Sequence, residues 1–197
     1  MTISILGIAG GTRSAGNSET LLDKALEGAS SAGADTRKLQ LNNLNIASCI
    51  CPDSEDCVLT GICTVADDMQ SVYSILRSVD LIFIAFPIAF RNVPAQTKQL
   101  FDRSQALWVS KYILRQKLRK QVSKGKGLII AVSDTDDPIE FEGAITSTRS
   151  WFASIDFEET DRLLVSNVIR KTDILKYPDQ LTRAFDKGYE LTTQMTS

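Results

Sequence analysis

The alternation of short apolar runs with amphipathic stretches constrains the fold of this 197-residue chain most strongly. The apolar runs have the length and composition of buried strands, and the stretches between them repeat apolar residues at helical spacing. The predicted strands cover residues 2–8, 36–41, 80–86, 127–132 and 163–169. Five helices are predicted between and after these strands. The first ends near residue 33, three others begin at residue 67, near residue 92 and at residue 178, and one spans residues 141–152. Five strands with interleaved helices predict an α/β fold with a doubly wound parallel sheet.

Length and composition fit one compact domain over residues 1–197, because 43% of the residues are hydrophobic and no repeat or long linker divides the chain. The net charge of −2 provides no general attraction to nucleic acid or to anionic membranes. No segment is apolar for long enough to span a bilayer, and the chain opens on a predicted strand without a secretory leader. We therefore expect a cytoplasmic protein. An acid-free basic run at 111–126 is expected to be a solvated helical face rather than a docking patch.

The four cysteines, Cys49, Cys51, Cys57 and Cys63, all fall in one short segment. The chain contains no histidine, so a tetracoordinate metal centre here would use cysteine thiolates or a carboxylate. This residue set favours an iron–sulfur cluster or structural zinc. Disulfides are the alternative, but they are rare in the expected compartment. The crowding of cysteines therefore predicts one thiolate-ligated centre.

A glycine-rich loop, GGTRSAGNSET, follows the first predicted strand at residues 10–20. In a doubly wound sheet, ligands bind beyond the carboxyl ends of the strands, and a helix N-terminus with glycines, hydroxyls and an arginine suits a phosphate. Asn17 stands where the triphosphatase loop has its lysine, and the dinucleotide glycine spacing is absent. The loop therefore favours a terminal monophosphate such as that of FMN. Without histidine, a Ser-His-Asp triad is excluded, and we assign no catalytic side chain.

Three segments carry a family resemblance: ILGIAGGTRSAGNSE near the start, the cysteine segment that runs into CTVADDM, and FPIAFRNVPAQTKQLFDR from Phe86 to Arg103. With them, the chain resembles the flavodoxin-like NAD(P)H-dependent FMN reductases, in particular their iron–sulfur flavoprotein branch. The resemblance implies a flavodoxin-like sheet in the order 2-1-3-4-5, with a cysteine-containing insertion at about 46–66 after the second strand. It also implies NAD(P)H or a ferredoxin-type protein as electron donor, and a homo-oligomer, either a dimer or a tetramer.

The resemblance also implies cofactor ligands. The FMN phosphate would be bound by Gly11, Thr12, Arg13, Asn17, Ser18 and Thr20, and the isoalloxazine ring by Pro87, Ile88, Ala89, Phe90 and Asn92. The four cysteines would ligate a [4Fe–4S] cluster. Their first two gaps, of one and five residues, depart from the family spacing and leave zinc or free cysteines open.

The implied function is electron transfer between the donor, FMN and the cluster. A plain NAD(P)H-dependent FMN reductase and a non-enzymatic redox carrier or sensor are the alternatives. Ala89 stands where the family often has an aromatic residue, and the loop from Ser133 to Pro138 lacks glycines. The three aspartates of that loop would disfavour a reduced, anionic flavin if they lay beside it.

Overall fold

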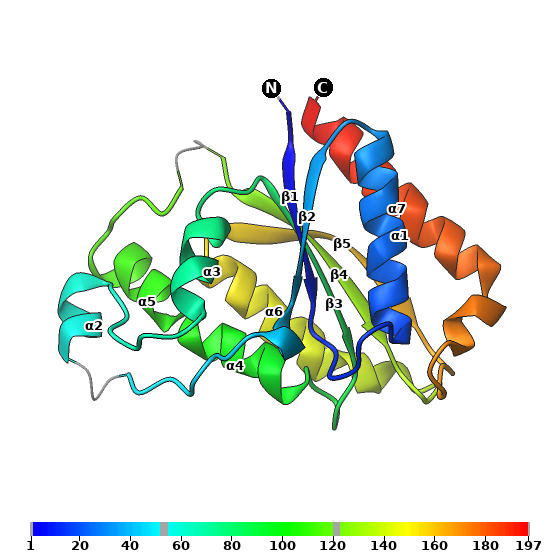
Figure 1. The fold of residues 1–197 in the computed structure, drawn as a ribbon, viewed down its shortest axis with the longest axis horizontal. Coiled ribbons are helices and arrows are strands. Elements are labelled where there is room, and N and C mark those ends of the chain that lie inside the picture. Colours follow the sequence, from blue (N-terminus) through cyan, green and yellow to red (C-terminus); the bar gives the residue numbers. More distant parts are fainter. Residues whose placement is uncertain (1, 52–54, 120–122, 197) are drawn as a thin grey trace.

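A computed structural model describes residues 2–51, 55–119 and 123–196 of the chain (Figure 1). Its centre is one five-stranded sheet in the order β2-β1-β3-β4-β5, with every neighbouring pair parallel. The predicted doubly wound sheet and its strand order are confirmed. The strands are β1 (Ser4–Ala9), β2 (Asp35–Gln40), β3 (Leu81–Pro87), β4 (Gly125–Val132) and β5 (Phe157–Val165).

Helices cover both faces of the sheet (Figure 1). One face carries α1 (Asn17–Ser31) and α7 (Pro178–Thr196), and the other carries α3 (Met69–Leu76), α4 (Ala95–Arg103), α5 (Gln105–Trp108) and α6 (Glu142–Ser154). The short α2 (Glu55–Thr60) lies in the cysteine segment, to the side of the sheet. Short 3-10 turns lie at Leu41–Asn43, Pro138–Phe141 and Asp173–Lys176, and a π-helical turn at Val109–Ile113 follows α5. No helix in the described part of the chain is long and apolar enough to cross a membrane.

The central strands contribute side chains to two hydrophobic cores, one on each face of the sheet. Along β3, Phe83 packs into the core under α1 and α7, whereas its neighbours Ile82 and Ile84 pack into the core under α3, α4 and α6. All three side chains are fully buried. A parallel strand covered on both faces reads as a continuous apolar run, and this run made β3 the clearest strand in the sequence.

The last strand differs from its prediction. Instead of covering 163–169, β5 begins at Phe157 and ends at Val165. It is the edge strand of the sheet, and its first half carries charged side chains such as Glu158 and Asp161. An edge strand with one solvated face lacks the apolar run of a central strand, so only its end was recognised. Residues 166–172 therefore form a loop beyond the strand.

The helix predicted to begin near Asn92 begins instead at Ala95, with Pro94 as its extended N-cap. The chain first makes a tight turn, in which the amides of Ala89 and Asn92 each donate to the other's carbonyl, at 2.8 and 3.0 Å. The two residues between them, Phe90 and Arg91, both adopt positive φ, as in a hairpin turn. Because Asn92 is the last residue of this turn, the helix begins three residues later than predicted.

The basic run at 111–126 does not form the solvated helical face that we expected. The described part of the run is helical only at its start, in the turn that ends at Ile113. Arg119 is buried and donates to the carbonyl of Val79, while Lys111 and Lys126 form ion pairs with acids of β5 or the turn before it. Lys120 lies outside the described residues. The three cations Lys111, Arg119 and Lys126 are engaged within the fold, which speaks against a docking patch for an anionic partner built on them.

Candidate functional site

A cavity of about 200 Å³ lies beyond the carboxyl ends of β1, β3 and β4, and the loop after β5 also lines it. We call it the strand-end cavity. Most of the predicted flavin residues line it together, from two segments far apart in the sequence. The lining residues are Gly11, Thr12, Arg13, Gly16, Asn17, Ser18, Pro87, Ile88, Val132, Asp134, Val168, Ile169 and Lys171. This is the place where strand order reverses between β1 and β3, where doubly wound sheets bind ligands.

The glycine-rich loop is held in shape from both ends. The Gly10 amide donates to Ala85, and its carbonyl accepts the Thr97 hydroxyl at 3.0 Å. A Cβ at Gly10 would stand 2.2 Å from that hydroxyl oxygen, so only glycine fits there. At the other end, Ala15 adopts a positive φ of 53° and its amide donates to the buried Glu19 carboxylate at 2.7 Å. The loop is thus positioned before any ligand arrives.

The N-terminus of α1 offers backbone amides that an anion can bind. Its N-cap, Gly16, makes no side-chain capping hydrogen bond, so the amides of the first turn are available along with the positive end of the helix dipole. Arg13 and Lys171 add two cationic side chains to the lining of the same cavity. This combination suits a phosphate group.

Glu19 fastens the loop to the edge of the sheet. Besides the Ala15 amide, it accepts hydrogen bonds from Lys38 at 3.0 Å and Gln40 at 2.6 Å, both on β2. Burial raises the pKa of the Glu19 carboxyl, but the hydrogen bonds from Lys38, Gln40 and Ala15 outweigh it and leave the pKa below its ordinary value. Its charged form therefore stabilises the fold.

Replacing Glu19 by glutamine is expected to destabilise the protein by about 1–2 kcal/mol near neutral pH, because charge-assisted hydrogen bonds are lost. A carboxyl with a lowered folded pKa stabilises above its unfolded pKa of about 4.3 and ceases to stabilise as the pH falls through its folded value. The difference between wild type and Glu19→Gln should therefore shrink in acid. Thermal unfolding across this pH range measures it.

Asp23→Asn is the matched control, since Asp23 also pairs with Lys38 but its side chain is about half exposed. An exposed pair contributes little, so this variant should unfold close to wild type at every pH. A Glu19→Gln variant that keeps its full deficit in acid would show that Glu19 does not act through its charge.

Two of the predicted phosphate ligands use their side chains within the fold. The Asn17 amide donates to the carbonyl of Arg170 at 2.8 Å and its oxygen accepts the Ile174 amide at 3.2 Å. The Thr20 hydroxyl donates to the carbonyl of Gly16 at 3.0 Å and does not line the cavity. The Asn17 side chain therefore joins the start of α1 to the segment after β5. In this structure its role is to hold two parts of the cavity lining together.

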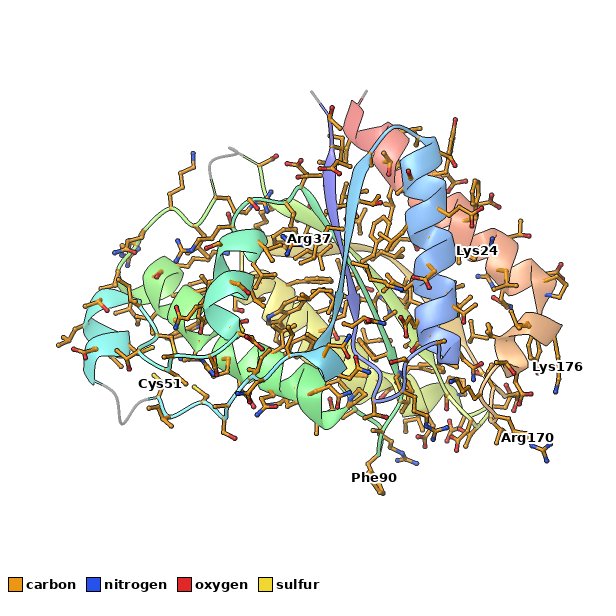
Figure 2. The ribbon with its side chains drawn as sticks, in the orientation of Figure 1. Lys24, Arg37, Cys51, Phe90, Arg170 and Lys176 are labelled. Atoms are coloured by element: carbon orange, nitrogen blue, oxygen red, sulfur yellow. The ribbon has the colours of Figure 1, made fainter. Side chains whose placement is uncertain are left out.

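Three of the predicted ring contacts lie outside the strand-end cavity. Ala89, Phe90 and Asn92 form the tight turn after β3, and the Phe90 side chain is fully exposed and projects away from the body of the molecule (Figure 2). The Asn92 side-chain oxygen accepts the Val93 amide and the Ser147 hydroxyl. The turn borders the site, with Pro87 and Ile88 as its inner neighbours.

Six lining residues were not among the predicted site residues: Gly16, Val132, Asp134, Val168, Ile169 and Lys171. Gly16 lies in the predicted glycine-rich loop and Asp134 in the 133–138 loop, whereas Val132, Val168, Ile169 and Lys171 were missed. The loops that carry them are joined by backbone hydrogen bonds, from Ile88 to Val132 at 2.8 Å and from Val168 to Ser133 at 3.0 Å. The sequence could have indicated these residues, because every strand of a parallel sheet ends at the same edge and the loops after β4 and β5 therefore lie beside the glycine-rich loop. The loop after β5 was overlooked because the predicted strand extended to residue 169, four residues past the true end at Val165.

The four cysteines meet in a second, small cavity of about 10 Å³, which we call the cysteine cavity. It is lined by Cys49, Ile50, Cys51, Cys57, Cys63, Thr64, Arg103, Gln105 and Ala106. All four cysteines are free thiols, which sets aside the disulfide alternative for this structure. Figure 2 shows Cys51 on the side of α2, away from Arg170 beside the strand-end cavity.

The thiols lie close enough to influence one another. Burial raises the pKa of the Cys57 thiol to about 12, with a hydrogen bond to Cys51 and the negative charge of the other cysteines adding to the shift. Within the described residues, no three histidine, cysteine or acidic side chains converge as ligands of one metal ion. The residue types fit a thiolate-ligated centre, but the closed cavity must open to admit one.

A buried ion pair supports the cysteine segment. Arg103, at the end of α4, contacts the Asp67 carboxylate, and both side chains are almost entirely buried. Asp67 also accepts the amides of Ala47 at 2.8 Å and Met69 at 3.0 Å, the latter at the start of α3 as its sequence position suggested. Asp68, by contrast, is exposed and accepts the Asn45 amide. Of the two aspartates, Asp67 is the one that pairs with Arg103, a lining residue of the cysteine cavity.

Comparison with solved structures shows the same fold. An NAD(P)H:quinone oxidoreductase from Methanothermobacter marburgensis superimposes with a TM-score of 0.71 at 17% identity, covering 97% of this chain and 98% of the other. An FMN-dependent NADH-azoreductase from Bacillus anthracis in complex with FMN gives 0.62 at 13% identity, covering 96% and 99%.

The sequence comparisons are more specific. An iron–sulfur flavoprotein of Methanosarcina thermophila is 35% identical over 127 residues, which are 62% of this chain and 63% of that protein. An iron–sulfur flavoprotein of Methanocaldococcus jannaschii is 30% identical over 123 residues, 62% of each chain. The match thus spans less than two thirds of these relatives' length. The model of the NADPH-dependent FMN reductase family matches residues 3–138, which include the glycine-rich loop, the cysteine segment and the turn after β3. The chain therefore belongs to the NADPH-dependent FMN reductase family and, within it, resembles the iron–sulfur flavoproteins.

Proposed function

We propose that this protein is an FMN-dependent oxidoreductase that passes electrons between NAD(P)H or a ferredoxin-type donor, FMN and a [4Fe–4S] cluster. FMN would occupy the strand-end cavity, and Cys49, Cys51, Cys57 and Cys63 would hold the cluster. The observation that carries the proposal is that the fold gathers two distant segments around one cavity and four cysteines around another. Membership in an FMN reductase family supports the flavin part.

The strand-end cavity suits the phosphate and ribityl end of FMN. Its volume of about 200 Å³ is below the ~300–1,000 Å³ of pockets that enclose whole ligands, so the ring would extend to the mouth. Gly11, Thr12, Arg13 and Ser18 would contact the phosphate, with Lys171 as a second cation. Asn17 and Thr20 would support them by holding the start of α1 in place.

The mouth of the cavity suits the ring. Pro87 and Ile88 present an apolar wall, and Ala89, Phe90 and Asn92 form the adjoining turn, from which the exposed Phe90 ring could close over a flavin. Asp134 lines the same cavity, and a carboxylate there would disfavour an anionic reduced flavin. The turn would thus position the ring, and Asp134 would bias its protonation.

When bound, FMN accepts a hydride and releases electrons singly, and a [4Fe–4S] cluster carries one electron at a time. The chain's own contribution is to bind, orient and shield the two groups. Arg13 and the α1 amides would hold the phosphate, and the cysteine segment would hold the cluster. No side chain is assigned as a proton donor.

One experiment tests the proposal: anaerobic purification or reconstitution, followed by visible spectra and analysis of flavin, iron, sulfide and zinc on one sample. We expect bound FMN and about four irons per chain, with flavin reduction by NAD(P)H. Protein that retains neither centre would contradict the proposal. Reduction by a ferredoxin-type donor but not by NAD(P)H would indicate a redox carrier instead.

A plain NAD(P)H-dependent FMN reductase is the second candidate function. The closed cysteine cavity, without a converged set of metal ligands among the described residues, favours it. In that case the cysteines would bind zinc or remain free. NAD(P)H-dependent flavin reduction by protein that lacks iron would support this reading over the first.

Replacing Arg13 by alanine is expected to weaken FMN binding by about 10- to 100-fold, because a charge-assisted contact to phosphate contributes about 1.5–3 kcal/mol. Fluorescence titration of the flavin measures the dissociation constant. Lys24→Ala on α1 is the control, since it removes an equal charge from a side chain that pairs with Glu27. An unchanged affinity in Arg13→Ala would remove Arg13 from the site.

We also propose that residues 1–197 form a single domain, with the insertion at about 46–66 in the interface of a homo-oligomer, a dimer or a tetramer. Exposed apolar side chains support this: Leu59 and Ile62 beside α2, and Tyr112 and Ile113 in the neighbouring π-helical turn. Free thiols suit a cytoplasmic location. Light scattering of wild type and Leu59→Glu measures the assembly, and a monomeric wild type would contradict it.

A further inference from the structure

Arg103 is the one cationic side chain among the described residues that line the cysteine cavity. Its side chain has no solvent exposure. The Nη1 group donates to Asp67 and to the carbonyl of Ala47 at 3.0 Å, and the Nη2 group donates to Asp67 at 3.1 Å and to the sulfur of Cys63 at 3.4 Å. The guanidinium therefore connects the cysteine segment, the start of α3 and the end of α4.

The guanidinium is clamped rather than free to turn. Asp67 accepts from both terminal nitrogens, which is the two-point arrangement that fixes a guanidinium plane. From α3, the Tyr73 hydroxyl donates to the backbone carbonyl of Arg103. With both ends held, the contact to Cys63 has a defined direction.

One donor of Arg103 remains unused. The Nε group is buried and has no hydrogen-bond partner among the described residues. Buried donors of charged groups are nearly always paired, because leaving one unpaired is costly. The Nε group of Arg119 is buried and unpartnered in the same way, but of the two arginines Arg103 is the one that lines the cysteine cavity and donates to Cys63.

We propose that Arg103 is a positioning residue of the cysteine centre, which orients Cys63 through its Nη2–H···S contact and raises the reduction potential of a cluster bound there. The inference rests on the proposed function. Hydrogen bonds to ligand sulfur withdraw negative charge and favour the reduced, more negative state of an iron–sulfur cluster. Asp67 balances the guanidinium charge, so the directed hydrogen bond is the main contribution.

The test is a redox titration of reconstituted wild type, Arg103→Met and Arg103→Lys, followed by electron paramagnetic resonance of the reduced cluster, with iron and sulfide counted per chain. We expect a more negative midpoint potential in Arg103→Met, and a potential between the two in Arg103→Lys, since lysine restores the charge and one donor without the planar geometry. A purely structural role would lower the loaded fraction but leave its potential unchanged.

Arg119→Met is the matched control. Arg119 is also a buried arginine, but it donates to the Val79 carbonyl and stacks on the Phe157 ring, apart from the cysteines. We expect this variant to lose stability without shifting the potential. A comparable shift in Arg119→Met would overturn the assignment, because it would trace the shift to general destabilisation.

The remaining outcomes are also decisive. If Arg103→Met does not fold, Arg103→Lys carries the test, and a wild-type potential in that variant overturns the inference. Equal potentials in all three loaded proteins overturn it while leaving the proposed function intact. A wild type that takes up FMN but no cluster overturns both the cluster proposal and this inference, so the two failures are distinguishable.

Discussion

Replacing Cys57 by alanine is expected to remove iron and sulfide from the protein while leaving its FMN content per chain unchanged. Cys57 is the most buried of the four cysteines, at 4% exposure, and lies among the other three. Loss of one of the four thiolates would leave one iron without its protein ligand, and the chain has no fifth cysteine and no histidine to replace it. The strand-end cavity shares no lining residue with the cysteine cavity, so the flavin should remain.

Iron, sulfide and released-flavin analysis of anaerobically reconstituted protein measures the result. Ser48→Ala is the control, because Ser48 precedes Cys49 in the same segment but is not a thiol. We expect the control to load like wild type. Loss of FMN together with iron in Cys57→Ala would mean that the cysteine segment organises the whole fold rather than holding a separate centre.

Replacing Asp67 by alanine is expected to lower the free energy of unfolding by about 3–5 kcal/mol, because it leaves the buried Arg103 guanidinium without its counter-charge. Burial raises the pKa of the Asp67 carboxyl, but hydrogen bonds from Arg103, Ala47 and Met69 outweigh it and keep the pKa below its ordinary value. The pair is therefore charged at neutral pH. Denaturant unfolding of cofactor-free protein measures the loss without reference to any bound group.

The neighbouring Asp68 provides the control. Its side chain is exposed and accepts the Asn45 amide, so Asp68→Ala should lose only about 1 kcal/mol. Equal losses in the two variants would contradict the distinct roles that the structure assigns to them. The sequence alone treats the two residues as equivalent acids at a helix start.

Much of the architecture was predictable from local patterns. The apolar run of β3 identified a strand buried on both faces, and the glycine-rich loop at the end of β1 was correctly expected at the carboxyl edge of a parallel sheet, where it lines a cavity. The edge strand β5 was misplaced, because its charged first half resembles a loop. That error concealed Lys171, which lies beyond the true end of the strand.

Side-chain direction was the main feature of the site that could not be predicted. Asn17 follows the glycine-rich loop as a phosphate ligand would, yet its amide is engaged with Arg170 and Ile174, which lie more than 150 residues later. Phe90 follows β3 as a stacking residue would, yet the left-handed turn directs its ring outward. Spacing along the chain does not reveal where such turns point.

By itself, the sequence determined the class of fold and marked the glycine-rich loop and the four cysteines as two candidate sites, because strand length, apolar periodicity, glycine-rich turns and crowded cysteines are all local properties of the chain. Only the tertiary structure decided which groups meet. It paired Asp67 rather than Asp68 with Arg103, brought Arg103 to the sulfur of Cys63, and placed Lys171 and Arg13 in the lining of one cavity. These contacts join residues far apart in the sequence, and they arise from the packing of helices and loops against the sheet, which no local pattern records.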